Sequence, residues 1–475
     1  MASQYETSVV IPSFSGLNQA GDGYNQTLRQ AREMENVDTT SGMFRPMREG
    51  RQLPYGLPYP IGTLACLSRR FGFPDDEKTV LVAMAGGKVY TRPLNKDEDW
   101  TVRYTGLSKD LNSYVTYEVN VEGHDPIDVL LFSNNTDGMF CLYGDDLHVT
   151  AVTTPYRFGV ISRFNERIWG TDIIGAPESL VYSAPFDPFN WDQNDETPED
   201  GGGEIMAPSW DGDRFVAMRQ FGSQLLCFKR NAIWRVLGTD PGEFVVREQH
   251  GQSTVSENTI AILNSLVFML GWGGIVRYDG AQSTAFLQEM VHDVMDRVNF
   301  DNVEVACAIM SGSKYCLALP LDGSTTNNAV LIYNGHEGTF NFRTGIPVKA
   351  FLGVDDRVFY TSATTPGRIF ELCDEGKSLP IVWRSGYQDL GIKSSVKSGF
   401  TVYFLAEAKT IFPLYIGIRT DKKLKMKRLL VKPGKATKTR LNVQGRYFRL
   451  EIASDSVIPF AVTGGFKIDM ELDPD

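Results

Sequence analysis

The chain contains a recurring unit that is clearest at residues 222–288, where two similar segments follow one another. Each segment has a short apolar run, at 224–228 and 266–270, then a turn, then a second run that carries an aromatic residue. Short runs rich in β-branched and aromatic residues and bounded by Gly, Asn or Asp are typical of antiparallel hairpins. The pattern predicts a meander of short strands.

The aromatic residue of the second run recurs along most of the chain. Seven such positions lie 37 to 55 residues apart, with a mean near 47. They are Tyr90, Phe140, Tyr182, Trp234, Tyr278, Tyr333 and Phe370. This spacing matches one blade of a propeller. We therefore expect an all-β chain in which residues 64–378 form a β-propeller of six or seven blades, with stacked β-sandwiches as the alternative.

The first 63 residues differ from this central region. Residues 1–63 are rich in polar residues and Pro, and they contain one helical candidate at 27–36. Such a segment buries too little surface to fold alone. We expect an extended N-terminal arm that lies along the body or reaches a neighbouring subunit.

The pattern changes again near residue 379. Residues 379–475 contain longer alternating runs, which predict a C-terminal β-sandwich. Within the propeller, apolar residues at helical spacing predict a single helix at 285–298, between blades.

Charge is distributed unevenly along the chain. The net charge is −11, but residues 421–449 hold eleven Lys or Arg and one Asp, which is +10, so the rest carries −21. This balance excludes a cationic footprint over the whole surface. The basic run predicts either a solvated strand face or a surface for an acidic partner or DNA. Its candidate residues are Lys422, Lys423, Lys425, Lys427, Arg428, Lys432, Lys435, Lys438 and Arg440.

A second candidate interaction site is a Pro-containing loop with three aromatic residues, Phe186, Phe189 and Trp191. Exposed aromatics at this loop could contact a partner. In the alternative interpretation, Pro188 sets a turn and the aromatics tuck under a blade. The carboxylates that follow, up to Asp200, predict a solvated or partner-facing loop.

Motifs of catalysis and metal binding are not found in the sequence. The five histidines are far apart, and none accompanies a nucleophile elbow or an HExxH pair. The six cysteines lack metal-type spacing, so we expect buried free thiols. No catalytic residue, metal or cofactor is expected. The chain has no leader-like N-terminus and no long apolar window, so we expect folding in a cytoplasm without stable membrane insertion.

Several short segments together resemble a known group of proteins. They are FSGLN (14–18), residues 31–37 and GMFRP (42–46), followed by the phrases ERIW, LVYSAPFDPFNW, LLCFKRNAIWRVLG and IVRYDG. Their order resembles that in bacteriophage virion proteins of the tail-hub, tail-nozzle or packaged-DNA-stabilisation type, in which comparable phrases mark successive blades. The resemblance spans most of the chain.

The resemblance implies a homo-oligomer, commonly six copies in a ring around the DNA channel. The expected function is that of a structural protein in the virion neck or tail, a hub or nozzle that lines or closes the channel and retains packaged DNA. Its partners would be further copies, portal-adaptor and other tail proteins, and genomic DNA. No enzymatic activity is expected. The alternatives are a receptor- or glycan-binding propeller at the tail tip and a polysaccharide-degrading enzyme.

Overall fold

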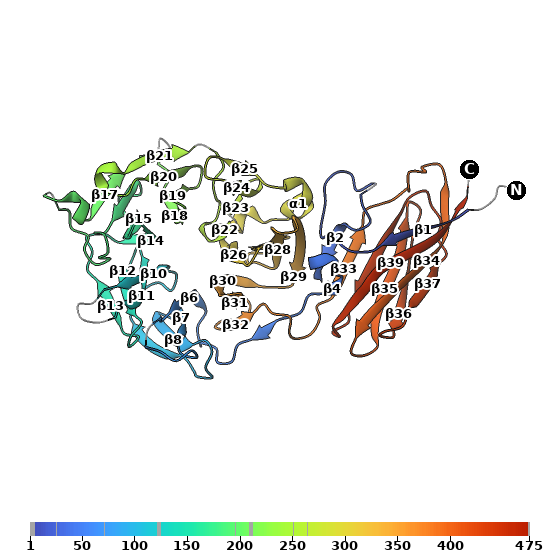
Figure 1. The fold of residues 1–475 in the computed structure, drawn as a ribbon, viewed down its shortest axis with the longest axis horizontal. Helices are drawn as coiled ribbons and strands as arrows, with labels where there is room; N and C mark the ends of the chain where they lie inside the picture. The colour runs from blue at the N-terminus through green and yellow to red at the C-terminus, as the bar shows by residue number, and fades with distance from the viewer. Residues whose placement is uncertain are drawn as a thin grey trace.

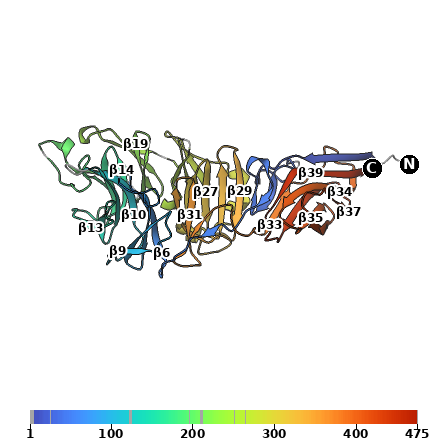
Figure 2. The same cartoon turned by 60° about the horizontal axis from the view of Figure 1, so that its bottom comes forward.

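The computed structural model describes residues 5–473, except 25, 71, 121–124, 195, 209–211, 250 and 264. Strands dominate, and the single α-helix of the described residues is α1 (Gln288–Met295). Short 3-10 turns are η1 (Thr40–Gly42), η2 (Pro198–Asp200), η3 (Pro241–Glu243), η4 (Glu257–Thr259) and η5 (Phe300–Val305). Figures 1 and 2 show a ring of sheets beside a smaller unit of two sheets. The expectation of an all-β chain is confirmed.

The ring consists of four-stranded antiparallel sheets, in which strands adjacent in the sequence are adjacent in the sheet. The first two contain β6 (Ile61–Ser68), β7 (Thr79–Ala85), β8 (Lys88–Pro93) and β9 (Thr101–Thr105), then β10 (Ser113–Val119), β11 (Ile127–Asn134), β12 (Gly138–Tyr143) and β13 (Val149–Val152). The next two contain β14 (Phe158–Phe164), β15 (Arg167–Ile173), β16 (Ser179–Tyr182) and β17 (Gly203–Met206), then β18 (Phe215–Phe221), β19 (Gln224–Lys229), β20 (Ile233–Leu237) and β21 (Val245–Gln249).

Three further sheets follow in the same pattern. They contain β22 (Ala261–Leu263), β23 (Leu266–Gly271), β24 (Gly274–Tyr278) and β25 (Ser283–Ala285); β26 (Cys307–Ser311), β27 (Lys314–Leu319), β28 (Ala329–Asn334) and β29 (Thr339–Thr344); and β30 (Val348–Val354), β31 (Arg357–Ser362), β32 (Ile369–Glu371) and β5 (Arg51–Gln52). The last sheet therefore takes its fourth strand from the N-terminal segment.

The repeat seen in the sequence has a structural counterpart. Its seven aromatic residues lie on the third strands β8, β12, β16, β20, β24, β28 and β32, one in each sheet. Tight turns define the hairpins, as at Gly86 and Gly87 between β7 and β8, where φ is +57° and +73°. Positive φ at both positions is the type I′ geometry, whose twist matches that of the strands.

The sheets are arranged around a common centre, which is the arrangement of a β-propeller (Figure 1). First strands of most neighbouring sheets contact each other, and β30 contacts β6, so the last sheet lies against the first. Buried apolar side chains fill the gaps between sheets: Val82 and Phe132 belong to the cluster between the first two, and Leu64 and Phe359 to the cluster between last and first.

The seam of the ring, where β5 pairs with β32, is held by charge as well as by the strand ladder. Arg51 and Gln52 pair with Glu371 and Phe370. The Glu371 carboxylate, which is buried, accepts hydrogen bonds from Arg51 and from Arg357, the latter at 2.8 Å. Arg51 and Glu371, which are 320 positions apart in the sequence, thus help to close the ring.

The two-sheet unit uses both ends of the chain. One sheet has the order β1 (Tyr5–Ile11), β39 (Phe460–Asp473), β34 (Val396–Ala408) and β37 (Thr437–Leu441). The other has the order β2 (Ala31–Glu35), β33 (Ile381–Ser385), β38 (Phe448–Ser454), β35 (Phe412–Thr420) and β36 (Leu424–Val431). A small ladder of β3 (Val37–Asp38) and β4 (Arg45–Pro46) lies nearby. Strands of the expected N-terminal arm, residues 1–63, take part in these sheets and in the last sheet of the ring.

The core of the two-sheet unit is continuous with that of the ring. Phe14 and Phe44 pack against Trp383 and Phe466, and all four rings are buried. The same apolar cluster reaches Phe340 on β29. Backbone hydrogen bonds add to this packing, since Leu17 N–H donates to the Phe340 carbonyl at 2.7 Å and Asn36 N–H donates to that of Phe342 at 2.8 Å. The N-terminal segment therefore joins the two parts.

The helix expected at 27–36 is wrong, because residues 31–35 of this segment form β2. Its register against β33 shifts between Ala31 and Glu33, which indicates a bulge. A bulge adds a residue to one strand, so that Ala31 and Met34 both reach the core although they are three residues apart. A spacing of three residues between buried positions is also typical of a helix, which explains the wrong prediction.

The helix expected at 285–298 is confirmed in a shorter form, as α1. Residues 283–285 belong to β25, and a left-handed Leu287 (φ +45°) separates strand from helix. Among the described residues, no helix has the length and apolar character needed to cross a bilayer.

Candidate interaction surfaces

The basic run lies at one margin of the two-sheet unit. Strand β36 ends the five-stranded sheet and β37 ends the four-stranded sheet, so each pairs on one side only. The two strands contact each other, and the connection between them carries Lys432 and Lys435. In Figure 1 they lie on the side of the unit away from the ring. We call the nine residues Lys422, Lys423, Lys425, Lys427, Arg428, Lys432, Lys435, Lys438 and Arg440 the basic edge.

The strand register shows which way these side chains face. Lys425 and Lys427 lie opposite Ile418 and Ile416, whose side chains are in the core, so the two lysines extend from the inner face of the sheet at its open margin. Arg428 lies opposite Tyr415, on the outer face. The basic residues therefore lie on both faces of the sheet at this edge.

The basic edge is exposed and almost free of internal ion pairs. All nine residues are solvent-exposed. Arg440 lies 3.3 Å from Glu471, and no salt bridge is seen for the other eight within the described part of the chain. Arg449, from the same basic run, is different: it is largely covered and pairs with Glu33 at 3.2 Å and Glu451 at 3.0 Å. The charges of the basic edge remain available to a partner.

Lysines at a sheet margin also have a structural effect. An edge strand presents free N–H and C=O groups on one side, and these can pair with another strand. Inward-pointing charges on the edge strand oppose such pairing. Lys425 and Lys427 are placed in this way. Their geometry thus disfavours unspecific strand addition, while their charge attracts an acidic surface.

The aromatic loop is only partly exposed. Phe186 is 64% exposed, whereas Trp191 is 4% exposed, packs against Phe158 with ring centroids 4.9 Å apart, and donates its indole N–H to the Pro188 carbonyl at 3.0 Å. Phe189 is half-buried over Tyr143. Trp191 and Phe189 therefore follow the interpretation in which the loop tucks under a sheet, and of the three only Phe186 is fully presented to a partner.

The connection between β16 and β17 that contains this loop is strongly acidic. Residues 186–200 hold six Asp or Glu and no Lys or Arg. Five of the carboxylates, which we call the acidic loop, are described and exposed: Asp187, Asp192, Glu196, Glu199 and Asp200. Asp195 lies outside the described residues. No salt bridge involves these five within the part of the chain that the structure describes.

A buried arginine holds the acidic loop in place. Arg167 on β15 is 1% exposed, and its guanidinium donates hydrogen bonds to the carbonyls of Ser183 (2.8 Å), Gly201 (2.6 Å) and Glu199. Burial lowers the pKa of Arg167. These bonds tie both ends of the loop to the ring. The sequence analysis did not identify this role, although the position of Arg167 directly before the apolar Ile168 and Trp169 of ERIW was a signal.

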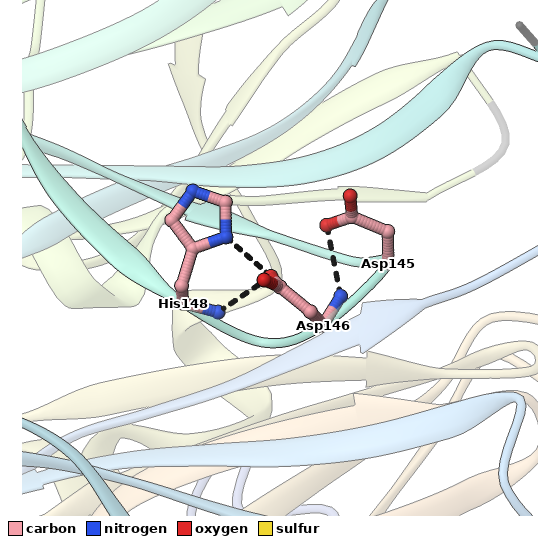
Figure 3. Close-up of side chains that lie close together, drawn as sticks. All are labelled: Asp145, Asp146 and His148. Carbon is pink, nitrogen blue, oxygen red and sulfur yellow. Dashed lines mark hydrogen bonds and ion pairs between the residues drawn. The ribbon is translucent and has the colours of Figure 1, made fainter.

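One further group of ionisable side chains comes together in the ring, at the turn after β12 (Figure 3). His148 Nδ1 contacts the carboxylate of Asp146, and Asp145 accepts the Asp146 N–H at 2.8 Å. The hydrogen bond from His148 is the main cause that lowers the pKa of Asp146. All three residues are exposed, and the His148 ring stacks on Tyr143. These contacts stabilise the turn, and nothing else here points to a bound ion.

The remaining histidines and the cysteines stand apart. His336 is exposed and His292 is half-buried, while His124 and His250 lie outside the described residues. The cysteines are free thiols, four buried and two partly buried. Burial raises the pKa of Cys141 to about 12 and that of Cys66 to about 11, so both stay protonated near neutral pH.

Comparisons with known proteins find likenesses of structure only. No family model matches the chain, and no curated protein matches its sequence. Similar solved structures include BBS1N in complex with ARL6DN (11% identity, 68% of this chain and 96% of that one, TM-score 0.42). Others are BamB from Moraxella catarrhalis (10%, 78% and 99%, 0.39) and the Pan2 WD40 domain of Neurospora crassa (7%, 67% and 90%, 0.38). At these values no statement about function follows from them.

Proposed function

We propose that the chain is a seven-bladed β-propeller with a C-terminal β-sandwich, and that it serves as a structural protein of a bacteriophage neck or tail. Each four-stranded sheet of the ring counts as one blade, and β5 completes the seventh. The two sheets that share Phe400 and Phe448 in one core, with ring centroids 5.1 Å apart, form the sandwich. The virion role rests on the sequence resemblance and on the two charged surfaces described above.

The observation that carries the proposal is the basic edge. Eight of its nine cations have no salt bridge among the described residues, and the chain outside residues 421–449 carries −21. Such an uncompensated surface on an otherwise acidic protein is suited to an acidic partner and not to general binding of nucleic acid. In a virion ring, this partner would be a further copy or an adjoining tail protein.

The mechanism would be mechanical. A closed propeller has few exposed edges, and each blade packs against two neighbours, so a ring of such units resists deformation. An acidic inner wall would repel the phosphate backbone and let DNA slide, while closure of the ring would retain it. No catalytic step is part of this function.

The test is charge reversal of Lys425, Lys427 and Arg428 to Glu in the phage. We expect particles that assemble poorly or lose their genome, measured by electron microscopy and by packaged DNA per particle. The matched control reverses Arg29, Lys109 and Lys377, which are also exposed but lie elsewhere. Normal assembly and genome retention by the basic-edge variant would contradict the proposal.

A receptor- or glycan-binding tail-tip protein is the second candidate, favoured by the exposed Phe186 ring. Aromatic rings commonly bind apolar faces of ligands. Glycan binding that is lost on Phe186→Ala, with Trp191 intact, would support this candidate over the channel protein.

A further inference from the structure

The two charged surfaces lie at opposite ends of the molecule. Figure 1 has the longest axis horizontal: β17, which follows the acidic loop, is on the side of the ring farthest from the two-sheet unit, and β36 and β37 lie at the other end. The acidic loop and the basic edge of one chain therefore cannot meet each other. Each is free to meet the other surface on a second copy.

The two surfaces are also alike in that their charges are not neutralised by internal salt bridges among the described residues. Eight of the nine cations of the basic edge have no salt bridge among the described residues, and neither do the five carboxylates of the acidic loop. Both are exposed. Arg167 keeps the acidic loop attached to the ring, so little order has to be gained when it docks.

We propose that the acidic loop of one copy docks on the basic edge of the next, in a head-to-tail contact. Like charges prevent either surface from pairing with itself, so the contact is heterologous, and repetition closes a ring where the rotation allows it. This inference rests on the proposed self-assembly of the chain and names the surfaces that carry it.

A second copy fits the basic edge better than DNA does. The cations surround a sheet margin from both faces, since Lys425 and Lys427 belong to the inner face and Arg428 to the outer one. A duplex would contact one face and would meet the repulsion of the acidic remainder. The acidic loop of a second copy, in contrast, can contact cations on both faces of the sheet along the edge formed by β36 and β37.

The experiment uses two triple variants of the full chain. The first, with Lys425→Glu, Lys427→Glu and Arg428→Glu, lowers the charge of the basic edge from +9 to +3 and places three carboxylates within it. The second, with Asp192→Lys, Glu196→Lys and Glu199→Lys, raises the charge of residues 186–200 from −6 to 0 and places three lysines in the acidic loop. Analytical ultracentrifugation at low and high salt measures association of each variant and of their equimolar mixture. Reversal of Arg29, Lys109 and Lys377 is the control, and thermal melting checks that every variant is folded.

We expect the wild type and the control to associate, and to dissociate as salt rises. Each triple variant alone should associate at least about tenfold more weakly, because the three reversed side chains meet like charges on the opposing surface and the net attraction between the two surfaces falls. Their mixture should recover association, since every reversed surface again meets its opposite. Recovery on mixing is the result that a merely misfolded variant cannot produce.

Three results would overturn the inference. If the wild type stays monomeric at low salt and high concentration, self-assembly and this contact both fail. If the wild type associates but the variants do so equally well, or their mixture does not recover, this contact alone is wrong. If the first variant keeps its association and instead loses binding to duplex DNA, the basic edge is a DNA surface.

Discussion

The ring and the two-sheet unit are both antiparallel β structures, but they are closed in different ways. In the ring, six sheets use strands that follow one another in the sequence, and only β5 comes from far away. In the two-sheet unit, β1 pairs with β39 and β2 with β33, across more than 300 residues. The ring buries its sheets against each other all the way round, whereas the unit leaves β36 and β37 as open margins.

This difference indicates which contacts stabilise each part and which surface is available to a partner. The stability of the closed ring depends on the pairing of β5 with β32. The stability of the open unit depends on the N-terminal segment that completes its core. Open margins need charge to stay unpaired, and that charge is then available for a partner. The predictions below test the core, the seam and the margin in turn.

The largest effect is expected in the core that the N-terminal segment completes. Phe44 is fully buried between Phe14, Trp383 and Phe466. Phe44→Ala should lower the free energy of unfolding by about 3–5 kcal/mol, because it leaves a cavity. The neighbouring Met43 is 39% exposed, and Met43→Ala should have little effect. Chemical denaturation measures both, and equal losses would contradict the assigned packing.

An intermediate effect is expected at the seam. Glu371→Gln weakens the bonds to Arg51 and Arg357 and should cost about 1–3 kcal/mol, near the lower limit because Arg51 is 47% exposed and screened. The rate of amide hydrogen exchange in β5 should increase together with this loss of stability. The control Glu375→Gln changes an exposed carboxylate 4.0 Å from Arg51.

The same carboxylate makes the seam sensitive to acid. The hydrogen bond from Arg357, aided by that from Arg51, lowers the pKa of Glu371 below its ordinary value of 4.5. Its stabilisation is therefore complete above about pH 4.5 and is lost as pH falls toward the lowered value. Glu371→Gln should flatten the acid limb of the stability curve, and an unchanged limb would exclude this contribution.

The smallest change in stability is expected at the margin. Replacing Lys425 and Lys427 by Ile should alter the free energy of unfolding by less than about 0.5 kcal/mol, since both side chains are exposed. The variant should nevertheless aggregate through β36. High salt should not reverse this aggregation, whereas it should dissociate the head-to-tail contact. Light scattering measures it, with Lys422→Ile and Lys423→Ile in the preceding turn as control. A monodisperse double-Ile variant would show that these lysines do not protect the edge.

Much of the candidate site could be located from the sequence, but its geometry could not. Net charge identified the basic run, and all nine of its predicted residues are exposed. Which face Lys425 belongs to depends on the register with β35, which no local pattern reveals. Likewise Trp191 has the same sequence context as Phe186, yet its burial depends on Phe158 and on the fold of the loop.

The sequence by itself determined the hairpins of the ring, the seven aromatic positions on the third strands, the helix α1 and the charge asymmetry. These features follow from turn residues, side-chain periodicity and composition, which act over a few neighbouring residues. Only the tertiary structure decided that residues 31–35 form a strand, that β5 closes the ring and that the acidic loop and basic edge lie at opposite ends. Such pairings join residues hundreds of positions apart, and the gain from burying both partners outweighs the local preference of either one.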